Sequence, residues 1–139
     1  MKVDKTLYDR IGGHSTLVAV HKTFYDKVYA HPWIGKFFDG LPQDYIEDQQ
    51  TNFMGGLFGG PKDYAGKMPK QAHRHMLITE ELFELRQVLL AESIDEFGLD
   101  AALKQEWLDA DRGLEKSVVK RDVNECSVSP GQPIMDFAP

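Results

Sequence analysis

Cysteine is almost absent from this sequence, since Cys126 is the only cysteine among 139 residues. One thiol cannot form an internal disulfide framework, and it cannot supply the repeated cysteines of zinc or iron–sulfur motifs. Disulfide-stapled scaffolds and cysteine-based metal centres are therefore excluded for this chain.

Long apolar runs and blocks of like charge are also missing. No apolar stretch approaches the roughly 20 residues of a membrane span, and the amino terminus MKVDKTLYDR is too polar for a signal peptide. The net charge is −6 and is spread along the chain, so neither nucleic acid nor an anionic membrane surface is expected as a partner. We expect a cytoplasmic protein that is monomeric or associates weakly.

Strand-like alternation of polar and apolar residues is rare, and helical periodicity dominates. A chain of 139 residues with 42% hydrophobic and 11% aromatic residues can bury the core of one domain. Ser15 or Thr16 is a suitable cap for a helix. The periodic segments and their stop signals predict an all-α protein with helices over residues 5–11, 15–30, 43–58, 79–97 and 100–120.

The last residues differ in character from the rest. Residues 122–139 (DVNECSVSPGQPIMDFAP) contain three prolines and show no periodicity. They predict an unstructured C-terminal tail behind a domain over residues 1–121. Docking of this tail would use its larger apolar residues, Ile134, Met135 or Phe137.

Four polar side chains fall on the apolar faces of the predicted helices. At 100° per residue, His21 and Tyr25 lie on the apolar arc of the second helix. Gln50 lies on that of the third helix, and Arg86 lies near the centre of the fourth. Burying such groups without partners costs roughly one to a few kcal/mol each. They therefore either form structural hydrogen bonds or converge on a polar ligand.

The connector between the third and fourth helices carries the most specific pattern, GGPxxYxG…AHRxxxIT. Residues 59–61 end one helix, and residues 61–72 are expected to form an extended loop with at most one helical turn before His73. His73 follows, shortly before Thr79 begins the next helix. A neutral imidazole held in this way is suited to be an axial ligand of a haem iron.

This pattern resembles the haem-binding stretch of the truncated haemoglobins, most closely those of group I. The similarity extends through LYDRIGG at 7–13, FYDKV at 24–28, FFDG at 37–40 and the last helix near residue 120. The resemblance implies the truncated globin fold, an all-α two-over-two helical sandwich that holds one haem b. We expect the haem to be non-covalent, because the sequence has no CxxCH attachment motif.

The resemblance also implies roles for particular residues. His73 resembles the proximal iron ligand. His75 is the alternative, because it follows only two residues later, where family members often have glycine. Tyr25 and Gln50 resemble the distal pair that donates hydrogen bonds to a bound ligand. The alternatives for this pair are a core tyrosine bonded to a carbonyl and a glutamine that joins two helices.

The expected haem wall is apolar, with Phe38 stacked on the porphyrin. The further wall candidates are Phe37, Ile46, Phe53, Met54, Leu57, Ile78 and Phe83. Tyr64, Lys67 and Lys70 stand near His73 in the sequence and could meet the haem propionates. The alternative is an ordinary apolar core with solvated lysines.

Arg86 departs from the family pattern, which usually has an apolar residue or tryptophan at this position. An arginine brings a permanent charge and five donors. It would therefore reach a propionate, steer an anion into the pocket, hydrogen-bond the bound ligand, or extend along its stem to solvent. Of the other histidines, His21 is expected to be buried, and His14 and His31 to be structural or solvated.

The resemblance implies a haem protein that binds O2, CO and NO at a histidine-ligated iron, for oxygen binding and transport or for NO detoxification. An NO dioxygenase activity would convert NO to nitrate and would need a separate reductase, because the sequence has no flavin or nicotinamide motif. A haem-free helical signalling or interaction module with a relict pocket is the alternative from a different class.

Overall fold

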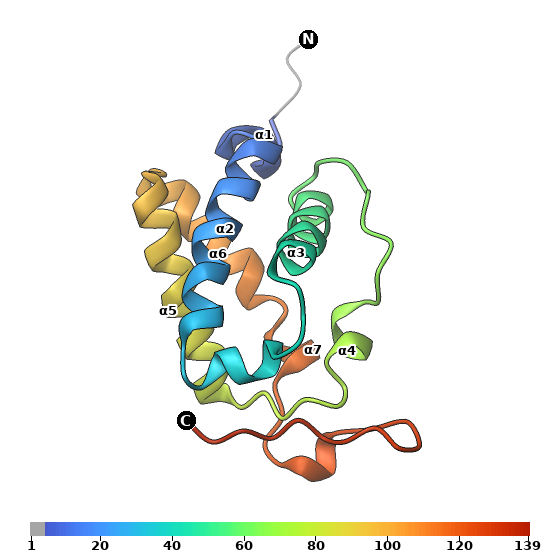
Figure 1. The fold of residues 1–139 in the computed structure, drawn as a ribbon. Helices are drawn as coiled ribbons and strands as arrows, with labels where there is room; N and C mark the ends of the chain where they lie inside the picture. The colour runs from blue at the N-terminus through green and yellow to red at the C-terminus, as the bar shows by residue number, and fades with distance from the viewer. Residues whose placement is uncertain (1–4) are drawn as a thin grey trace.

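The computed structural model describes residues 5–139, so the first four residues of the predicted 1–121 domain and of the MKVDKTLYDR segment lie outside it. Its elements in chain order are α1 (Leu7–Ile11), α2 (His14–Ala30), η1 (Ile34–Phe38), α3 (Gln43–Leu57), α4 (Pro69–Ala72), α5 (Glu80–Phe97), α6 (Ala101–Arg112), α7 (Glu115–Val118) and η2 (Val123–Glu125). The strand-type pairing seen in residues 5–139 is limited to the isolated bridges Met76–Met135 and Ile78–Val119. The all-α prediction is confirmed (Figure 1).

Threonine caps and glycine stops set the ends of two helices. Both glycine ends and the start of α5 after Thr79 lie where the sequence predicts them, whereas α1 begins at Leu7 and not at the predicted residue 5. In α1 the Thr6 hydroxyl accepts a hydrogen bond from a backbone N–H of the first turn, and Gly12 ends the helix with a φ of 107°. In α5 the Thr79 hydroxyl has the same role, and Gly98 ends the helix with a φ of 92°. Such left-handed positions favour glycine because it has no Cβ.

The start of α2 differs from the prediction. The helix begins at His14 with Gly13 as its N-cap, ahead of Ser15 and Thr16, so the prediction that one of these residues is the cap is wrong. Gly12 and Gly13 have positive φ angles of 107° and 73°. Two successive residues of this kind turn the chain sharply, and the helix begins directly after them.

The last predicted helix, over 100–120, is in fact two helices, α6 and α7. At the junction beside Gly113, the N–H of Leu114 donates to the carbonyl of Asp111 at 3.0 Å. This three-residue spacing tightens the turn and breaks the α-helical ladder. The chain is thereby redirected, so that α7 packs against α4.

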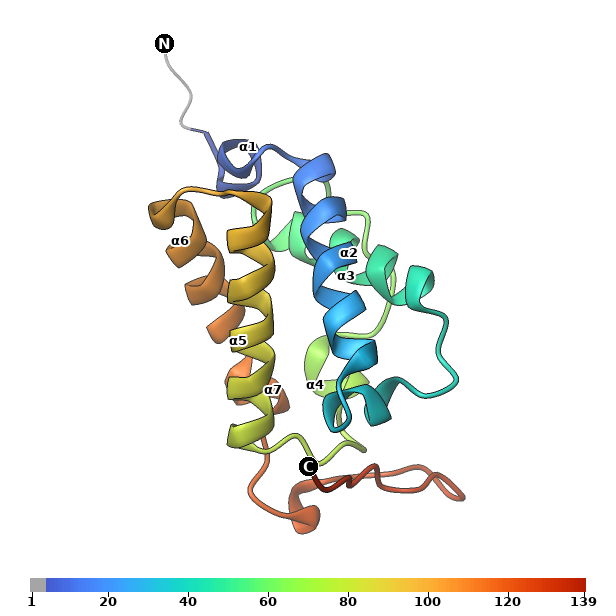
Figure 2. The same ribbon diagram turned by 60° about the vertical axis from the view of Figure 1, so that its left-hand side comes forward.

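The helices stack in two layers. Helix α2 packs against α3 and α5, and α5 packs against α6. The two views show the α2–α3 pair facing the α5–α6 pair (Figures 1 and 2). This is the two-over-two helical sandwich implied by the sequence resemblance. None of the helices in residues 5–139 has the length and apolar composition needed to span a membrane.

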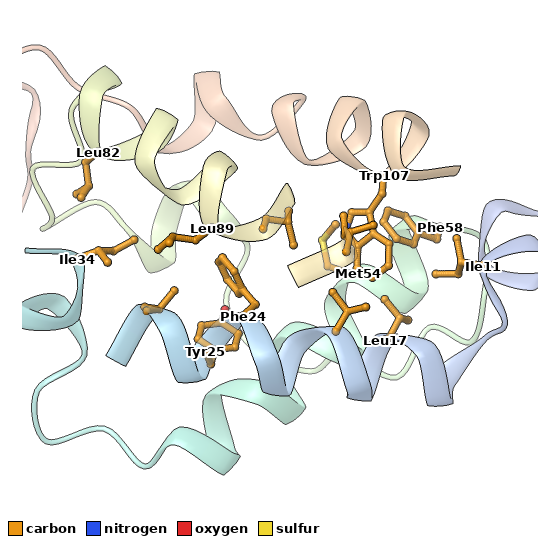
Figure 3. Close-up of a cluster of buried hydrophobic side chains, with 14 of the residues drawn as sticks. Ile11, Leu17, Phe24, Tyr25, Ile34, Met54, Phe58, Leu82, Leu89 and Trp107 are labelled. Carbon is orange, nitrogen blue, oxygen red and sulfur yellow. The ribbon is translucent and has the colours of Figure 1, made fainter. Parts of the chain in front are cut away.

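The core lies between these layers (Figure 3). Leu17 and Phe24 of α2, Met54 of α3 and Trp107 of α6 are each exposed by 1% or less, and Leu89 of α5 packs in the same cluster. Burial of a large apolar side chain stabilises the fold by about 1.5–3 kcal/mol. The core therefore fixes the helices from which the polar side chains of the site extend.

Residues 122–139, the tail, differ from the expectation of an unstructured segment. The N–H of Met135 donates to the carbonyl of His75 at 2.8 Å, and the ring of Phe137 packs edge-on against Phe37 with centroids 5.0 Å apart. The tail runs across the end of the sandwich near α4 and α7 (Figures 1 and 2). Of the predicted docking residues, Met135 and Phe137 dock, whereas Ile134 is exposed.

Candidate functional site

A cavity of about 310 Å³ opens between α2, α3, α5 and the connector that precedes α5. Its volume lies within the range of roughly 300–1,000 Å³ that is typical of small-molecule sites. Most of the predicted site residues line it: Tyr25, Phe37, Phe38, Ile46, Gln50, Phe53, Tyr64, Lys67, His73, Ile78, Phe83 and Arg86. The fold therefore brings together residues that are as many as 61 positions apart in the sequence, from Tyr25 to Arg86.

Three predicted residues lie away from this cavity. Met54 is fully buried in the core, because it is one residue and about 100° around the helix from Phe53. Leu57 is 47% exposed at the C-terminal end of α3, and Lys70 is exposed on α4. Met54 and Leu57, which were predicted for the haem wall, therefore do not line this cavity.

Some wall residues were not singled out by the sequence analysis. A helical pattern identifies them as apolar, but it does not show which apolar residues of neighbouring elements border a cavity and which fill the core. The principal ones are Ile34, Leu41, Met76, Leu82, Leu114 and Val118. They make the wall more strongly apolar than the predicted set alone.

His73 is held in one tautomer. It follows directly after the single turn of α4, and its Nδ1 lies 2.7 Å from the carbonyl oxygen of Pro69. A carbonyl only accepts, so Nδ1 carries the proton and Nε2 keeps its lone pair. Burial lowers the pKa of His73 below its ordinary value, although the Pro69 bond opposes this. The result is a neutral imidazole with a free nitrogen lone pair, which an iron ligand requires.

His75, the alternative ligand, is not brought to the same place. His73 belongs to the cavity wall, and His75 does not. The carbonyl of His75 is bonded to the tail at Met135. The geometry therefore favours His73 over His75 as the candidate iron ligand.

Tyr25 and Gln50 approach the cavity from α2 and α3. Tyr25 is 5% exposed, and its ring packs against Phe24 and Phe38 with centroids 4.8 and 5.9 Å apart. Burial raises the pKa of Tyr25 well above its ordinary value, so the hydroxyl stays protonated and can donate. Neither the Tyr25 hydroxyl nor the Gln50 amide is hydrogen-bonded to another residue of the described chain. The two structural alternatives for this pair are thus not what the structure contains.

Arg86 pairs with a buried carboxylate of α6. Its guanidinium forms an ion pair with Oδ2 of Asp111, and the amide of Gln87 donates to the same oxygen. The guanidinium carbon lies 5.4 Å from the ring centre of Phe24, a cation–π contact. Burial alone would lower the pKa of Arg86, but the Asp111 carboxylate more than offsets this effect and raises it.

The observed contact of Arg86, an ion pair with Asp111, is not among the contacts expected for it. The Arg86 side chain is part of the cavity wall and is 22% exposed, whereas the Asp111 side chain does not line the cavity and is 1% exposed. Extension of the arginine to solvent is not observed. The Asp111 carboxylate opposes the positive charge that was expected to steer anions.

Asp111 was not among the predicted site residues, although the sequence contains a signal for it. Asp111 stands four residues after Trp107 and eight after Leu103, on the apolar stripe of α6. A carboxylate on such a stripe requires a donor or a cation, and Arg86 is the matching charge on the apolar arc of α5. Asp111 Oδ1 and Trp107 Nε1 have no hydrogen-bond partner in residues 5–139.

His21 is buried, as predicted, with 1% exposure. Its Nδ1 lies 2.7 Å from Oγ1 of Thr51, and its ring packs edge-on to Trp107. Burial, followed by the positive charge of Arg86, lowers the pKa of His21 to about 3. His21 is therefore a neutral core residue that joins α2 to α3, and it is not part of the cavity wall.

The rim of the cavity is formed by the connector between α3 and α4. The Tyr64 ring packs against Phe53 with centroids 5.2 Å apart, and its hydroxyl donates to the carbonyl of Lys67. Lys67 is exposed and lines the opening. A flexible positive side chain thus stands where the cavity meets solvent.

Helices stacked two over two around an apolar cavity, with a neutral histidine in its wall, define a globin-like protein. The family model described as bacterial-like globin matches residues 6–119. The group 1 truncated haemoglobin GlbN of Mycolicibacterium paratuberculosis is 31% identical over 88% of this chain and 90% of its own length. That of Tetrahymena pyriformis is 33% identical over 76% of this chain and 88% of its own length.

Solved structures agree with this grouping. The Fe(III) form of the truncated haemoglobin from Tetrahymena pyriformis superposes with a TM-score of 0.79 and 30% identity, over 84% of this chain and 100% of that one. The group II truncated haemoglobin from Bacillus anthracis has the same TM-score at 20% identity, over 86% of this chain and 94% of that one, which supports the fold alone. The chain belongs to the bacterial-like globin family, in which haem is the cofactor and the ligands are diatomic gases such as O2. Its resemblance to the group 1 truncated haemoglobins, expected from the sequence, is confirmed.

Proposed function

We propose that the cavity binds haem b without a covalent link and that the protein binds O2, CO and NO reversibly. In this proposal His73 Nε2 ligates the iron on one side, and Tyr25 and Gln50 lie on the other. The observation that carries the proposal is the combination of a histidine in a fixed tautomer with two unpaired donors on one apolar cavity. Cys126 is not part of the cavity wall, which is consistent with non-covalent binding.

The bound haem would supply an iron with a coordination position open to a diatomic gas. The chain's own residues would select among the gases. The Tyr25 hydroxyl and the Gln50 amide are donors, so they would stabilise a ligand that carries partial negative charge more than a less polar one. O2 would therefore be favoured relative to CO.

The remaining wall residues would hold the porphyrin and exclude water. Phe38, Phe53, Ile78 and Phe83 supply apolar surface on the cavity, and each buried apolar contact favours retention of the cofactor. Lys67 stands at the opening, where it would meet a propionate. Ile46 lies one turn before Gln50 on α3 and supplies bulk without a polar group.

Detoxification of NO is the second role that we propose to test. Conversion of NO to nitrate with O2 consumes electrons, and a separate reductase would have to supply them. The hydrogen-bond donors for this role would be Tyr25 and Gln50, the same residues that would stabilise bound O2. The assay is consumption of NO by the oxygenated protein, with and without a reductase added.

The decisive experiment replaces the proposed iron ligand. Wild-type protein supplied with haem should give a Soret band, and CO should shift the band of the reduced protein. His73→Ala should lose haem or retain it only when imidazole is added, whereas the matched control His75→Ala should keep the wild-type spectrum. If His75→Ala loses haem and His73→Ala retains it, the iron ligand is His75 and the assignment of His73 is wrong. A wild-type protein that takes up no haem would favour the haem-free module with a relict pocket.

A further inference from the structure

The loop that carries His73, residues 73–78, is held on two opposite edges by chain that follows α6. On one edge the N–H of Leu77 donates to the carbonyl of Met135, and the N–H of Met135 donates to the carbonyl of His75, both at 2.8 Å. On the other edge the loop forms a bridge with Val119. Successive residues of an extended segment point their backbone groups to alternate sides, which is why both edges can be occupied at once.

Lys120 makes the densest set of contacts with this loop. Its Nζ donates to the carbonyls of His73 at 2.8 Å, Met76 at 2.9 Å and Val118 at 3.1 Å. An ammonium group has three hydrogens, so all of them are used. The backbone N–H of Lys120 also donates to the carbonyl of Ile78 at 2.8 Å. One residue thus ties the first and last carbonyls of the His73 loop to the end of α7.

Lys120 is unusual among the lysines of residues 5–139 because it is only 8% exposed. Its acceptors are carbonyls rather than carboxylates, and burial lowers its pKa below the ordinary value. A buried ammonium is costly unless every hydrogen is bonded, and an apolar side chain would be easier to bury here. An apolar side chain has no donor, however, so it could not hold the carbonyls of His73 and Met76 in place as Lys120 does.

The tail also contacts η1, another element of the cavity wall. The indole N–H of Trp33 donates to the carbonyl of Phe137 at 2.8 Å, and Nζ of Lys36 donates to the carbonyl of Ala138 at 3.0 Å. The Phe137 ring packs against Phe37, which is part of the cavity wall. The same segment therefore joins the His73 loop to η1.

We propose that Lys120, together with the extended segment at Met135, is a positioning element for His73, which pre-orders the loop and so strengthens retention of haem iron. This inference rests on the proposed function, in which His73 is the proximal ligand. A loop that is already ordered loses less conformational entropy when its histidine binds iron. Lys120 and Met135 lie just outside residues 6–119, the part that the family model matches.

The test compares Lys120→Met with Lys116→Met, a matched control because Lys116 is exposed on α7. We measure transfer of ferric haem from the full-length protein to excess apomyoglobin. Lys120→Met should lose haem at least about tenfold faster than wild type, because two loop carbonyls lose their donor. Lys116→Met should stay within about twofold, and Lys120→Arg, which keeps charged donors, should recover part of the loss. The iron–histidine stretching band of the reduced protein, seen by resonance Raman, should shift in Lys120→Met and remain unchanged in Lys116→Met.

A second measurement uses the haem-free protein and separates the two proposals. Amide hydrogen exchange of residues 74–78 should be at least about tenfold faster in Lys120→Met, because the loop opens more often. Unchanged haem loss and unchanged exchange would overturn the inference while leaving His73 as the ligand. If wild type takes up no haem, the proposed function fails, and the exchange rates alone decide whether Lys120 orders the loop. If Lys120→Met does not fold, Met135→Pro replaces it, since it removes the N–H bonded to His75, and wild-type haem loss in that variant overturns the inference.

Discussion

Replacement of Arg86 by methionine tests how the pair with Asp111 contributes to stability. Arg86→Met keeps much of the apolar stem but leaves a carboxylate that is 1% exposed without its cation. Removal of one partner of a buried ion pair costs about 3–5 kcal/mol. The Arg86 side chain is 22% exposed at the cavity wall, so water can approach the vacated position, and we expect a value near the lower limit, about 3 kcal/mol.

Removal of both charges should be far less harmful. In Arg86→Met/Asp111→Leu the carboxylate is replaced by an apolar side chain, and the main remaining defect is the Gln87 amide, which loses its acceptor. That defect costs about 1–2 kcal/mol. The double variant should therefore be more stable than the Arg86→Met single variant, with a coupling energy between the two sites of at least about 1 kcal/mol.

The assay is urea unfolding of the haem-free proteins, followed by far-ultraviolet circular dichroism at pH 7. In a parallel thermal unfolding experiment, a loss of about 3 kcal/mol corresponds to a fall in Tm of roughly 10–15 °C for a domain of this size. The matched control is Arg10→Met, which breaks an ion pair with Glu106 in which the two side chains are 39% and 44% exposed. This control should leave the unfolding midpoint nearly unchanged, because exposed pairs contribute little. If Arg86→Met behaves like the Arg10 control, or if the double variant is less stable than Arg86→Met, the reasoning about buried charge is refuted.

Two further predictions concern ligand release and acid stability. Tyr25→Phe should raise the O2 dissociation rate at least about tenfold, since a hydrogen bond to a charged group contributes roughly 1.5–3 kcal/mol. Gln50→Leu should act in the same direction and non-additively in stopped-flow measurements, and wild-type rates in both variants would remove their distal role. His21 has a folded-state pKa of about 3 against an unfolded value of 6.5, so its contribution to stability is present above pH 6.5 and is lost as the pH falls toward 3. The full loss is on the order of 5 kcal/mol. His21→Gln should flatten the dependence of the unfolding free energy on pH between 6.5 and 4, whereas an unchanged slope would mean that other groups cause the acid sensitivity.

The helices and the polar side chains on them were predictable because both follow from local spacing. Glycine and threonine mark the ends of α1 and α5, and a 100° step puts Tyr25, Gln50 and Arg86 on inward-facing arcs. The same arithmetic failed for Met54 and Leu57. The position of a residue on the apolar face of a helix predicts that it faces inward. It does not predict whether a neighbouring element packs against that residue or leaves a cavity beside it. Leu57 is exposed because α3 extends past the cavity that its arc faces.

Pairs of interacting residues that belong to elements far apart in the sequence were not predictable from residue spacing. Asp111 is 25 residues from Arg86, and their pairing depends on how α5 and α6 are set against each other. The tail gave no periodic signal because its strongest links, at Ser127 and Met135, are backbone hydrogen bonds, which any residue except proline can donate. Lys120 was missed for a related reason, because a lysine in the sequence is assigned to solvent by default.

The contacts of Lys120 also bear on the order in which this chain folds. Lys120 is joined to His73 across 47 residues and to Met76 across 44, whereas each helix closes over steps of four. Closing a long loop costs chain entropy before the contact stabilises anything, and contacts of this kind form late. We therefore expect the helical sandwich to assemble first and the iron ligand to be set last. A chain caught between these two steps would give the full helical signal in circular dichroism and still fail to hold haem, so cofactor uptake, rather than helix content, would report that folding is complete.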